Sequence, residues 1–518
     1  MKKRFILSLL IVLISTFAFA DEGMWMINQI KQLELDKKGM ELKPEDLYSP
    51  GRTSLLDAIV WLGGCSASFV SEQGLVLTNH HCAYRALQRN ASKSGIDYIK
   101  DGFLAENKSQ ELPAMGSNSY VIQEINNVTP EISAATEGTN DLVKKQRLID
   151  LKIEAMKEEL ESASDDISVK IASMFEGKEY WQFVYKKYQD VRIVYAPPSS
   201  IGKYGGDIDN WMWPRHTGDF TYLRVYQGPD GSGAKYSKDN IPLTPKNYLR
   251  VATTPLKEGD FSFILGFPGK TTRWQTSYSV AWALEHRYKT RIKEFSELIE
   301  IIDSFGEKEQ MAKIKLAGFR SGLANSMKNY QGNVDGIAKS NFIQQKQNYE
   351  ADLMTFINNH PEYKKKYGNV FTEIEEQFKR TSAIQAQNTA IQAFSRLSGT
   401  ISTVGNTVYE IARERSKPVS ERELGFSKSN IKQKTNRLKY SYFSFYEPFD
   451  KVILARALSR VNSFSDCKFF EGLEFIKDVD AFVETAYSKT KLKDPAYVKE
   501  LYSNLRKNLN RWMSRSLN

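Results

Sequence analysis

Histidine and cysteine are scarce in this sequence, whose 518 residues contain five histidines and three cysteines. A metal-dependent hydrolase needs several ligands that converge on one ion, and so few candidates do not supply such a set. The phosphate-loop pattern G-x-x-x-x-G-K-[ST] is also missing, because Ile264 stands where the stretch "LGFPGKT" would need its first glycine. We therefore expect no metal, no nucleotide and no other cofactor.

Long apolar runs are missing after the first 20 residues, since no later stretch reaches the roughly 18 residues of a membrane span. The beginning of the chain is different. Residues 2–4 are basic, residues 5–17 are mainly apolar, and residues 18–20 read AFA, the small-x-small pattern that signal peptidase cuts. We expect residues 1–20 to be a secretory signal peptide and the mature protein to be soluble and exported, with a periplasmic location in a cell that has an outer membrane.

Uninterrupted charge of one sign is equally rare, although the formal net charge is +10. The basic runs, such as residues 364–366, are interleaved with acidic residues. This mixture is typical of a solvated helix face rather than of a nucleic-acid surface, so we expect no nucleic-acid partner.

Glycine is unevenly distributed, with 21 of the 31 glycines before residue 276 and ten after it. The early part has short β-branched or aromatic runs bounded by Gly, Pro and Asp, as expected of strands, at residues 67–70, 75–78, 220–226 and 261–265. In the later part, apolar residues recur in steps of three and four, as in a helix. The sequence predicts an α+β protein: a strand-rich domain over 21–275, interrupted by a helix near 141–162, and an α-helical domain over 276–518.

Cys65 and Cys82 flank a predicted strand, turn and strand, a hairpin that would bring its two ends together. Export favours disulfide formation, so we expect these two cysteines to be bonded. Cys467, in the helical part, is then left as a free and buried thiol.

The stretch "VLTNHHCAYRALQ" places His80 and His81 directly before Cys82. Three interpretations compete for this pair: a metal site, a catalytic base beside a disulfide, and two histidines that only pack. Adjacent histidines diverge on a strand or a helix, and a bonded Cys82 cannot be a ligand, so a metal site is disfavoured. Packing would be the default for an isolated histidine.

The surroundings favour the catalytic base. "GGCSASFVSEQGLVLTNHHC" has the layout of the first half of a chymotrypsin-like protease barrel, in which the histidine before the second cysteine is the general base. Together with "KYGGDIDNWMWPRHTGDFTYLRVY" and "GFPGKTTRW", it closely resembles the bacterial dipeptidyl-peptidase 7 and dipeptidyl-peptidase 11 family of serine exopeptidases. The resemblance extends from about residue 21 into the helical region.

The resemblance implies a double β-barrel of chymotrypsin type with a large inserted α-helical domain, which releases dipeptides from free peptide N-termini. Matched residue by residue, His81 is the base and Asp219 in "HTGD" is the acid that orients it. Asn210 and Trp211 match the residues that hold the terminal amine of the substrate. The partners implied are peptides with a free N-terminus, and members of the family tend to form dimers.

Several other residues compete for these roles. Asp219 by itself also suits a plain cap or turn residue, and we interpret Asp207 and Asp209 as residues that shape the loop or lie near the substrate. His216 is interpreted as structural. Ser232, in "GPDGSGAKY", is a Gly-flanked serine that we assign to a hairpin turn.

The sequence departs from the family at the nucleophile. The family's serine lies in a Gly-Asn-Ser-Gly-Ser-Pro motif in the second barrel, and that motif is absent from these 518 residues. We therefore expect the first barrel to be present, the second barrel to be largely missing and the nucleophilic serine not to lie in this chain, as in a C-terminally truncated member. The alternative is a non-catalytic remnant or paralogue of the family that binds peptides.

Overall fold

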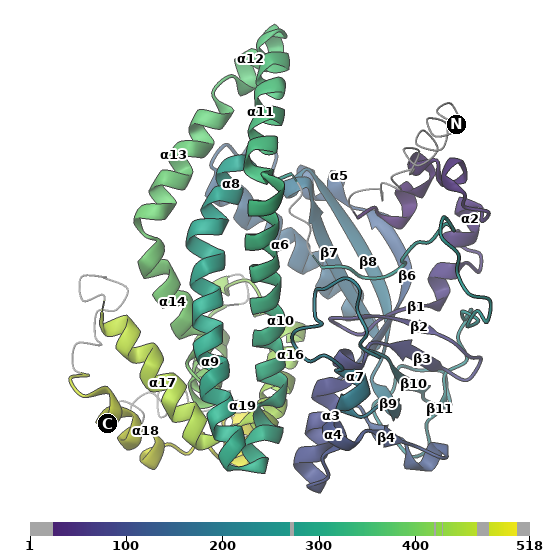
Figure 1. Cartoon of the computed structure of the whole chain (residues 1–518), viewed down its shortest axis with the longest axis vertical. Coiled ribbons are helices and arrows are strands. Elements are labelled where there is room, and N and C mark those ends of the chain that lie inside the picture. The colour runs from purple at the N-terminus through teal and green to yellow at the C-terminus, as the bar shows by residue number, and fades with distance from the viewer. Residues whose placement is uncertain (1–23, 270–273, 419–420, 427, 464–475, 505–518) are drawn as a thin grey trace, which may run out of the picture.

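The computed structural model describes residues 24–269, 274–418, 421–426, 428–463 and 476–504. Two regions lie side by side in Figure 1: a sheet half, residues 24–269, and a helical half, residues 274–504. The expected signal peptide and Cys467 lie outside the described residues. No helix within the described ranges has both the length and the apolar character needed to cross a membrane.

The sheet half is organised around one antiparallel sheet. Its strands are β1 (Ile59–Trp61), β2 (Ser66–Phe69), β3 (Leu75–Thr78), β4 (Phe103–Leu104), β5 (Leu112–Pro113), β6 (Ser119–Asn127), β7 (Ile167–Met174), β8 (Glu179–Tyr188), β9 (Asp190–Ala196), β10 (Thr221–Gln227) and β11 (Ile241–Pro242). The order is β4-β9-β10-β3-β2-β1-β6-β8-β7, with β11 paired to β10 and β5 to β9. In the part of the chain that the structure describes, β4 and β7 at the two ends are not paired, so hydrogen bonds do not close the sheet into a ring.

The sheet half also contains helices, of which α3 and α6 are the long ones. They are η1 (Ile27–Leu33), η2 (Leu35–Lys38), α2 (Pro44–Leu47), η3 (Leu55–Ala58), α3 (His80–Ser94), α4 (Tyr98–Asp101), η4 (Lys108–Gln110), α5 (Thr129–Ala134), α6 (Leu142–Glu161), η5 (Phe175–Gly177) and α7 (Ser199–Gly202). Both α3 and α6 cover apolar surfaces of the sheet.

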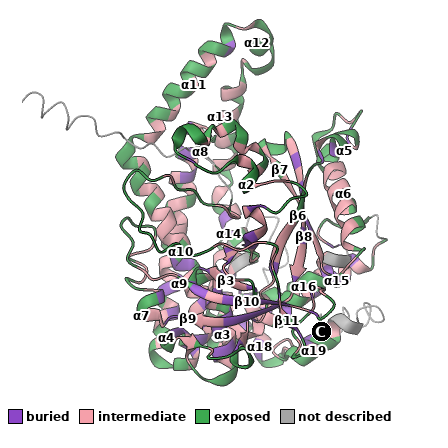
Figure 2. Cartoon of the chain, turned by 90° about the vertical axis from the view of Figure 1, so that its right-hand side faces the viewer, coloured by how far each residue is buried: buried purple, intermediate pink, exposed green. Residues whose placement is uncertain are grey.

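The core beneath α3 holds the centre of the sheet. Alternate residues of β2 and β3 are buried, as the two-residue period of a strand requires, and Phe69 and Val76 face the same core. Leu87 of α3 packs against them and is fully buried. Burying each such side chain stabilises the fold by roughly 1.5–3 kcal/mol, so this core fixes the helix on the hairpin. Figure 2 shows these buried segments together at the base of the molecule.

Helix α6 covers the long β6-β8-β7 ribbon. Its first turn is capped by Asp141, whose side chain accepts hydrogen bonds from two backbone N–H groups. Ile149, Ile153 and Met156 then pack, at helical spacing, against the cluster around Ile132.

The helical half contains long helices and short connections. They are α8 (Ser277–Trp282), the π-helix η6 (Ala283–Tyr288), α9 (Lys289–Lys308), α10 (Gln310–Ser340), α11 (Phe342–Asn358), α12 (Pro361–Tyr367), α13 (Val370–Ala383), α14 (Gln385–Leu397), α15 (Thr400–Arg415), α16 (Lys428–Ser441), η8 (Tyr442–Ser444), α17 (Glu447–Asn462), α18 (Val479–Lys489) and α19 (Pro495–Asn504). Leu298 and Ile302 of α9 meet Leu323 of α10 and Phe449 of α17 in one core. The helical periodicity of the sequence therefore describes this half well.

One predicted strand is not formed. The segment 261–265 has the composition of a strand but runs without strand pairing, and Ile264 is 95% exposed. A strand needs a neighbour to accept and donate its backbone hydrogen bonds, and no strand of the described sheet is paired with this segment. Composition alone therefore misassigned it.

Candidate active site

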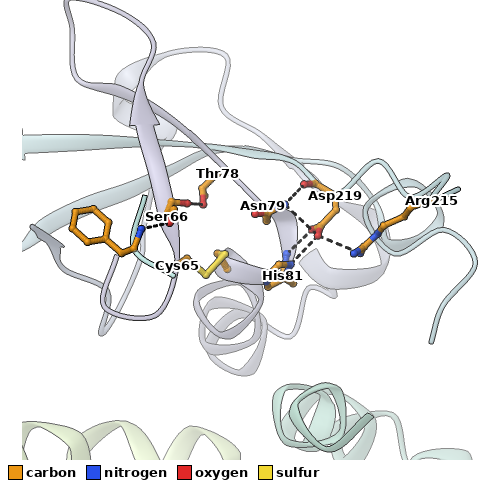
Figure 3. The surroundings of a disulfide bond; sticks show 9 residues. Cys65, Ser66, Thr78, Asn79, His81, Arg215 and Asp219 are labelled. Carbon is orange, nitrogen blue, oxygen red and sulfur yellow. Dashed lines mark hydrogen bonds and ion pairs between the residues drawn. A yellow bond between two sulfur atoms is a disulfide. The ribbon is translucent and has the colours of Figure 1, made fainter. Parts of the chain in front are cut away.

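The β2-β3 hairpin and its disulfide deliver the two neighbouring histidines to one place. Cys65 precedes β2 and Cys82 lies in the first turn of α3, and their sulfur atoms are bonded (Figure 3). The Thr78 hydroxyl, at the end of β3, donates to the Ser66 carbonyl across the hairpin at 2.9 Å. The chain therefore leaves β3 and enters α3 in a geometry that is fixed on both sides of His81.

His81 contacts Asp219, which lies two residues before the start of β10. The Nδ1 atom of His81 lies 2.8 Å from Oδ2 of Asp219, and the backbone N–H of His81 donates to Oδ1 at 3.0 Å. A proton on Nδ1 satisfies the first contact and leaves Nε2 with a lone pair. The His81 side chain is 60% exposed, and among the described residues Nε2 makes no hydrogen bond. Asp219 thus orients the imidazole through Nδ1, and Nε2 remains accessible.

Asp219 is held in its charged form. Its side chain is only 9% exposed, and Arg215 Nη2 and Asn79 Nδ2 lie 3.3 and 3.4 Å from Oδ2. Burial acts to raise the pKa of Asp219, but hydrogen bonds from His81, its positive charge when protonated and the charge of Arg215 together lower the pKa below its ordinary value. The N-terminus of α3 adds a favourable field for a carboxylate.

Asp219 also acts as a cap, but of a distant helix. Asp219 does not cap its own strand; it accepts the backbone N–H of a residue in the first turn of α3, 138 residues earlier. One carboxylate thereby caps the helix and orients the side chain that the helix presents.

His80 has the opposite surroundings. Its side chain is 1% exposed, it packs edge-on against Tyr84, and a Cβ at Gly202 would clash with its ring. Burial is the main cause that lowers the pKa of His80, while the negative charge of Asp219 acts to raise it. Nε2 of His80 is buried without a partner in the described structure. Of the two neighbours, only His81 can reach a bound molecule.

Residues 203–219 form a loop, here called the tryptophan loop, between α7 and β10. Asn210 Nδ2 donates to Asn325 Oδ1 on α10 at 3.0 Å, and the Trp211 indole N–H donates to the same oxygen at 3.1 Å. Trp211 has a backbone φ of 57°, a left-handed conformation that is strained for a bulky residue. Asn210 Oδ1 accepts no hydrogen bond from the described residues, so it remains available to a ligand.

The rival acids in this loop have other partners. Asp209 accepts from the backbone N–H groups of His216 and Thr217 at 3.0 and 2.9 Å, which closes the loop on itself. Hydrogen bonds from Thr217 and from His216 lower the pKa of Asp209. Asp207 pairs with Lys203 and with Arg320. Among the described carboxylates, the one that contacts His81 is Asp219.

Ser232 lies in the turn between β10 and β11. Its hydroxyl donates to Asp230 at 2.6 Å, and its backbone N–H donates to the same oxygen at 3.0 Å. A hydroxyl used in this way serves the turn, and no contact joins it to His81 in the described structure.

The ligand atoms of Cys65, His81 and Cys82 lie within 4.8 Å of one another. This spacing would suit a metal ion if both sulfurs were thiolates. The disulfide removes them as ligands, because only a thiolate binds a metal well. The arrangement therefore favours an oriented base over a metal centre.

Sequence reasoning missed three of the residues that complete this arrangement. Asn79 and Arg215 lie inside the motifs that were singled out, and the four-residue spacing of Arg215 from Asp219 was an available signal. Asn325 had no local signal, because it lies in the middle of a 31-residue helix and meets the tryptophan loop only through the fold.

Known proteins are similar to this chain in both sequence and structure. Residues 20–515 match the model of the family described as Peptidase S46. An Asp/Glu-specific dipeptidyl-peptidase of Shewanella putrefaciens is 34% identical over 94% of this chain and 66% of its own length. Dipeptidyl-peptidase 7 of Capnocytophaga gingivalis is 37% identical over 73% of this chain and 53% of its own length.

The crystal structure of Porphyromonas endodontalis DPP11 in complex with the dipeptide Arg-Glu superposes with a TM-score of 0.75. It is 26% identical and covers 95% of this chain and 71% of its own. The present chain spans about half to two thirds of the length of the two curated relatives. Since the family model covers nearly every residue, the chain belongs to the peptidase S46 family.

Proposed function

We propose that this chain carries the base, the acid and the amine-binding site of a serine-type dipeptidyl aminopeptidase. The observation that carries the proposal is the His81–Asp219 contact of 2.8 Å, with Nε2 of His81 open to solvent. A serine hydroxyl is a weak nucleophile near neutral pH, so an imidazole in this state is the partner that it needs.

In this mechanism, Nε2 of His81 takes the proton of the attacking serine and then returns it to the leaving amine. Asp219 keeps the proton of the resting imidazole on Nδ1 and stabilises the imidazolium that forms. Its lowered pKa serves this role, because the carboxylate stays charged throughout. His80 is buried and takes no part in proton transfer.

Asn210 and Trp211 supply the amine-binding site in this proposal. An ammonium group needs hydrogen-bond acceptors, and Asn210 Oδ1 is free to accept while its Nδ2 is held by Asn325. The Trp211 side chain is fixed by Asn325 yet 57% of the residue is exposed, which offers an aromatic face to a cation.

We propose that the nucleophile is a serine outside these 518 residues, and that the sheet described here, although its end strands β4 and β7 are not paired, forms the first of two chymotrypsin-type barrels. Two observations support this: the family's serine motif is absent from the sequence, and the curated relatives are longer. Relatives named dipeptidyl-peptidase 7 and Asp/Glu-specific dipeptidyl-peptidase share the release of dipeptides, and we propose that shared reaction alone.

Export to the periplasm and a homodimer complete the proposal. The basic and apolar start of the sequence supports export, and the resemblance to the family supports the dimer. N-terminal sequencing of the mature protein, expected to begin at Asp21, and sedimentation analysis test the two points.

A second candidate is a peptide-binding protein without catalysis. It is favoured by the state of Ser232, whose hydroxyl is engaged by Asp230 rather than by His81. The two candidates share the amine site and differ in the nucleophile.

The experiment compares the complete gene product with the polypeptide 21–518. We expect dipeptide release and fluorophosphonate labelling from the complete product, and loss of release in its His81→Ala variant by several orders of magnitude. The polypeptide 21–518 is expected to show neither. A labelled serine inside 21–518 would contradict the proposed location of the nucleophile, with Ser232→Ala as the first check. A complete product that binds peptides but releases nothing would establish the second candidate.

A further inference from the structure

Helix α10 touches both parts of the candidate site. Near its start, Gly318 packs against Gln88 of α3, the helix whose first turn presents His81. Gln88 also donates a hydrogen bond to the carbonyl of Lys315 on α10. Further along, Asn325 of α10 holds the amide and indole groups of the tryptophan loop. One helix of the helical half therefore contacts the helix of the base and the loop of the amine site.

A second contact between α10 and this loop is made by Arg320. Its Nη1 donates to Asp207 of the tryptophan loop at 2.9 Å. Its Nε and Nη2 donate to the two carboxylate oxygens of Asp303 on α9, at 2.6 and 2.8 Å. The planar guanidinium is thus fixed by a bidentate contact on one side and presents its remaining edge to the loop.

Apart from its last residue, Asp219, which is bound to Asn79 and His81 at the start of α3, the tryptophan loop has few other described contacts to hold it in place. Ile208 is 81% exposed and Trp213 is 93% exposed, so these large side chains contribute little apolar burial. Asp209 closes the loop on itself but does not attach it to another element. The attachment to α10 therefore depends on two residues. Arg320 binds Asp207, and Asn325 binds the side chains of Asn210 and Trp211.

We propose that Arg320 is a positioning residue for the amine site: through Asp207 it fixes the tryptophan loop against the helical half, so that Asn210 and Trp211 meet the substrate's terminal ammonium. The inference rests on the proposed function. Arg320 acts through another residue, so its loss weakens substrate binding more than it slows bond cleavage. The Asp303 contact serves to orient the guanidinium, and its removal leaves the Arg320–Asp207 pair in place.

The test uses the complete gene product and its Arg320→Gln and Asp207→Asn variants. Both are expected to raise KM for a peptide with a free N-terminus about tenfold, with kcat within twofold, as for the loss of one contact in a coupled pair. The double variant should be no worse than either single variant. Arg320→Lys keeps the charge near Asp207 and should recover most of the loss. Calorimetry with the free and the acetylated peptide measures Kd for the wild type and each variant. It detects the weakened binding of the free peptide whether or not cleavage occurs.

Arg380→Gln is the matched control, since within the described part of the chain this exposed arginine of α13 pairs with Glu376 of its own helix at 3.7 Å. It should leave KM unchanged. Unchanged KM and Kd in folded Asp207→Asn, a fall in kcat alone, or additive losses in the double variant would each overturn the inference. If Arg320→Gln does not fold, Asp207→Asn and Arg320→Lys decide. A wild-type protein that binds free and acetylated peptides equally would instead overturn the amine site itself, and the inference with it.

Discussion

In the sheet half, the residues of the candidate site lie within two short stretches: 65–82, which contains β2 and β3, and 203–219, the loop that precedes β10. In the helical half, the residues that reach the site are single polar side chains on α10, such as Arg320 and Asn325. The first half supplies an imidazole that Asp219 orients, and the second supplies contacts that hold a loop. The residues of the candidate site are therefore encoded locally, whereas the contacts that position the loop are encoded across the fold.

The largest effect that separates the two halves is expected from Asp219→Asn in the complete gene product. An amide donates where the carboxylate accepted, which disfavours the His81 tautomer with its proton on Nδ1, and we expect kcat to fall by about 10⁴. The measurement is steady-state dipeptide release. Asp230→Asn, in the turn that holds Ser232, should change kcat less than twofold. If Asp303→Asn in the helical half lowered kcat equally, the two halves would not differ in their contribution to catalysis.

The sequence predicts the sheet half's site because its signals are local. A strand, turn and strand with cysteines at both ends, followed by His81, specifies a hairpin that places the histidine at its end. The two-residue period of β2 and β3 and the helical period of α6 are visible in the same way. The match of Asp219 to a family motif then supplied the second residue.

The site contacts made by the helical half had no comparable local signal in the sequence. On a 31-residue helix, Arg320 and Asn325 look like an ordinary solvated face. The packing of α10 on α3, at Gly318 and through the Gln88–Lys315 hydrogen bond, brings them to the tryptophan loop. The segment 261–265, which was predicted to be a strand, also depends on distant parts of the fold. A strand forms only beside a pairing partner, and local composition does not reveal whether one is present.

The second largest effect is expected from removing the Cys65–Cys82 disulfide. Closing a loop of this length stabilises the folded state by about 3 kcal/mol in the chain-entropy model, so the double alanine variant should lose about that much free energy of unfolding. Urea denaturation of wild type and variant measures it. Cys467→Ala, at the cysteine predicted to be free, should cost much less. A comparable loss in that variant would show that the helical half depends on its cysteine as the sheet half does.

A smaller effect tests the contact between the halves. A Cβ at Gly318 would overlap the buried side chain of Gln88, so Gly318→Ala should lower the free energy of unfolding by about 1–2 kcal/mol through overpacking. Gly322 lies one turn further on the same helix and has open space beside it. Gly322→Ala is therefore the matched control, expected to stabilise by about 0.5–1 kcal/mol through helix propensity. If both variants behave alike in urea denaturation, α10 does not pack on α3 as described.

The smallest effect separates His80 from His81 within the sheet half. Burial lowers the pKa of His80, so at mildly acidic pH the unfolded chain binds a proton that the folded chain does not. Stability from this histidine is therefore complete above about pH 6.5, the ordinary pKa of the unfolded state, and is lost as pH falls from there toward the folded pKa. The slope cannot exceed about 1.4 kcal/mol per pH unit.

His80→Phe should remove this slope, because phenylalanine fills the space beside Tyr84 and binds no proton. The measurement is the free energy of urea unfolding at pH 5 and pH 7.5 for wild type and variant. The difference between the two proteins isolates the contribution of His80 from that of every other group. His81→Phe is the control, and it should retain the wild-type loss at low pH that His80 causes. If His80→Phe keeps the same slope, the buried histidine is not the group that responds, and the contrast between the two neighbours fails.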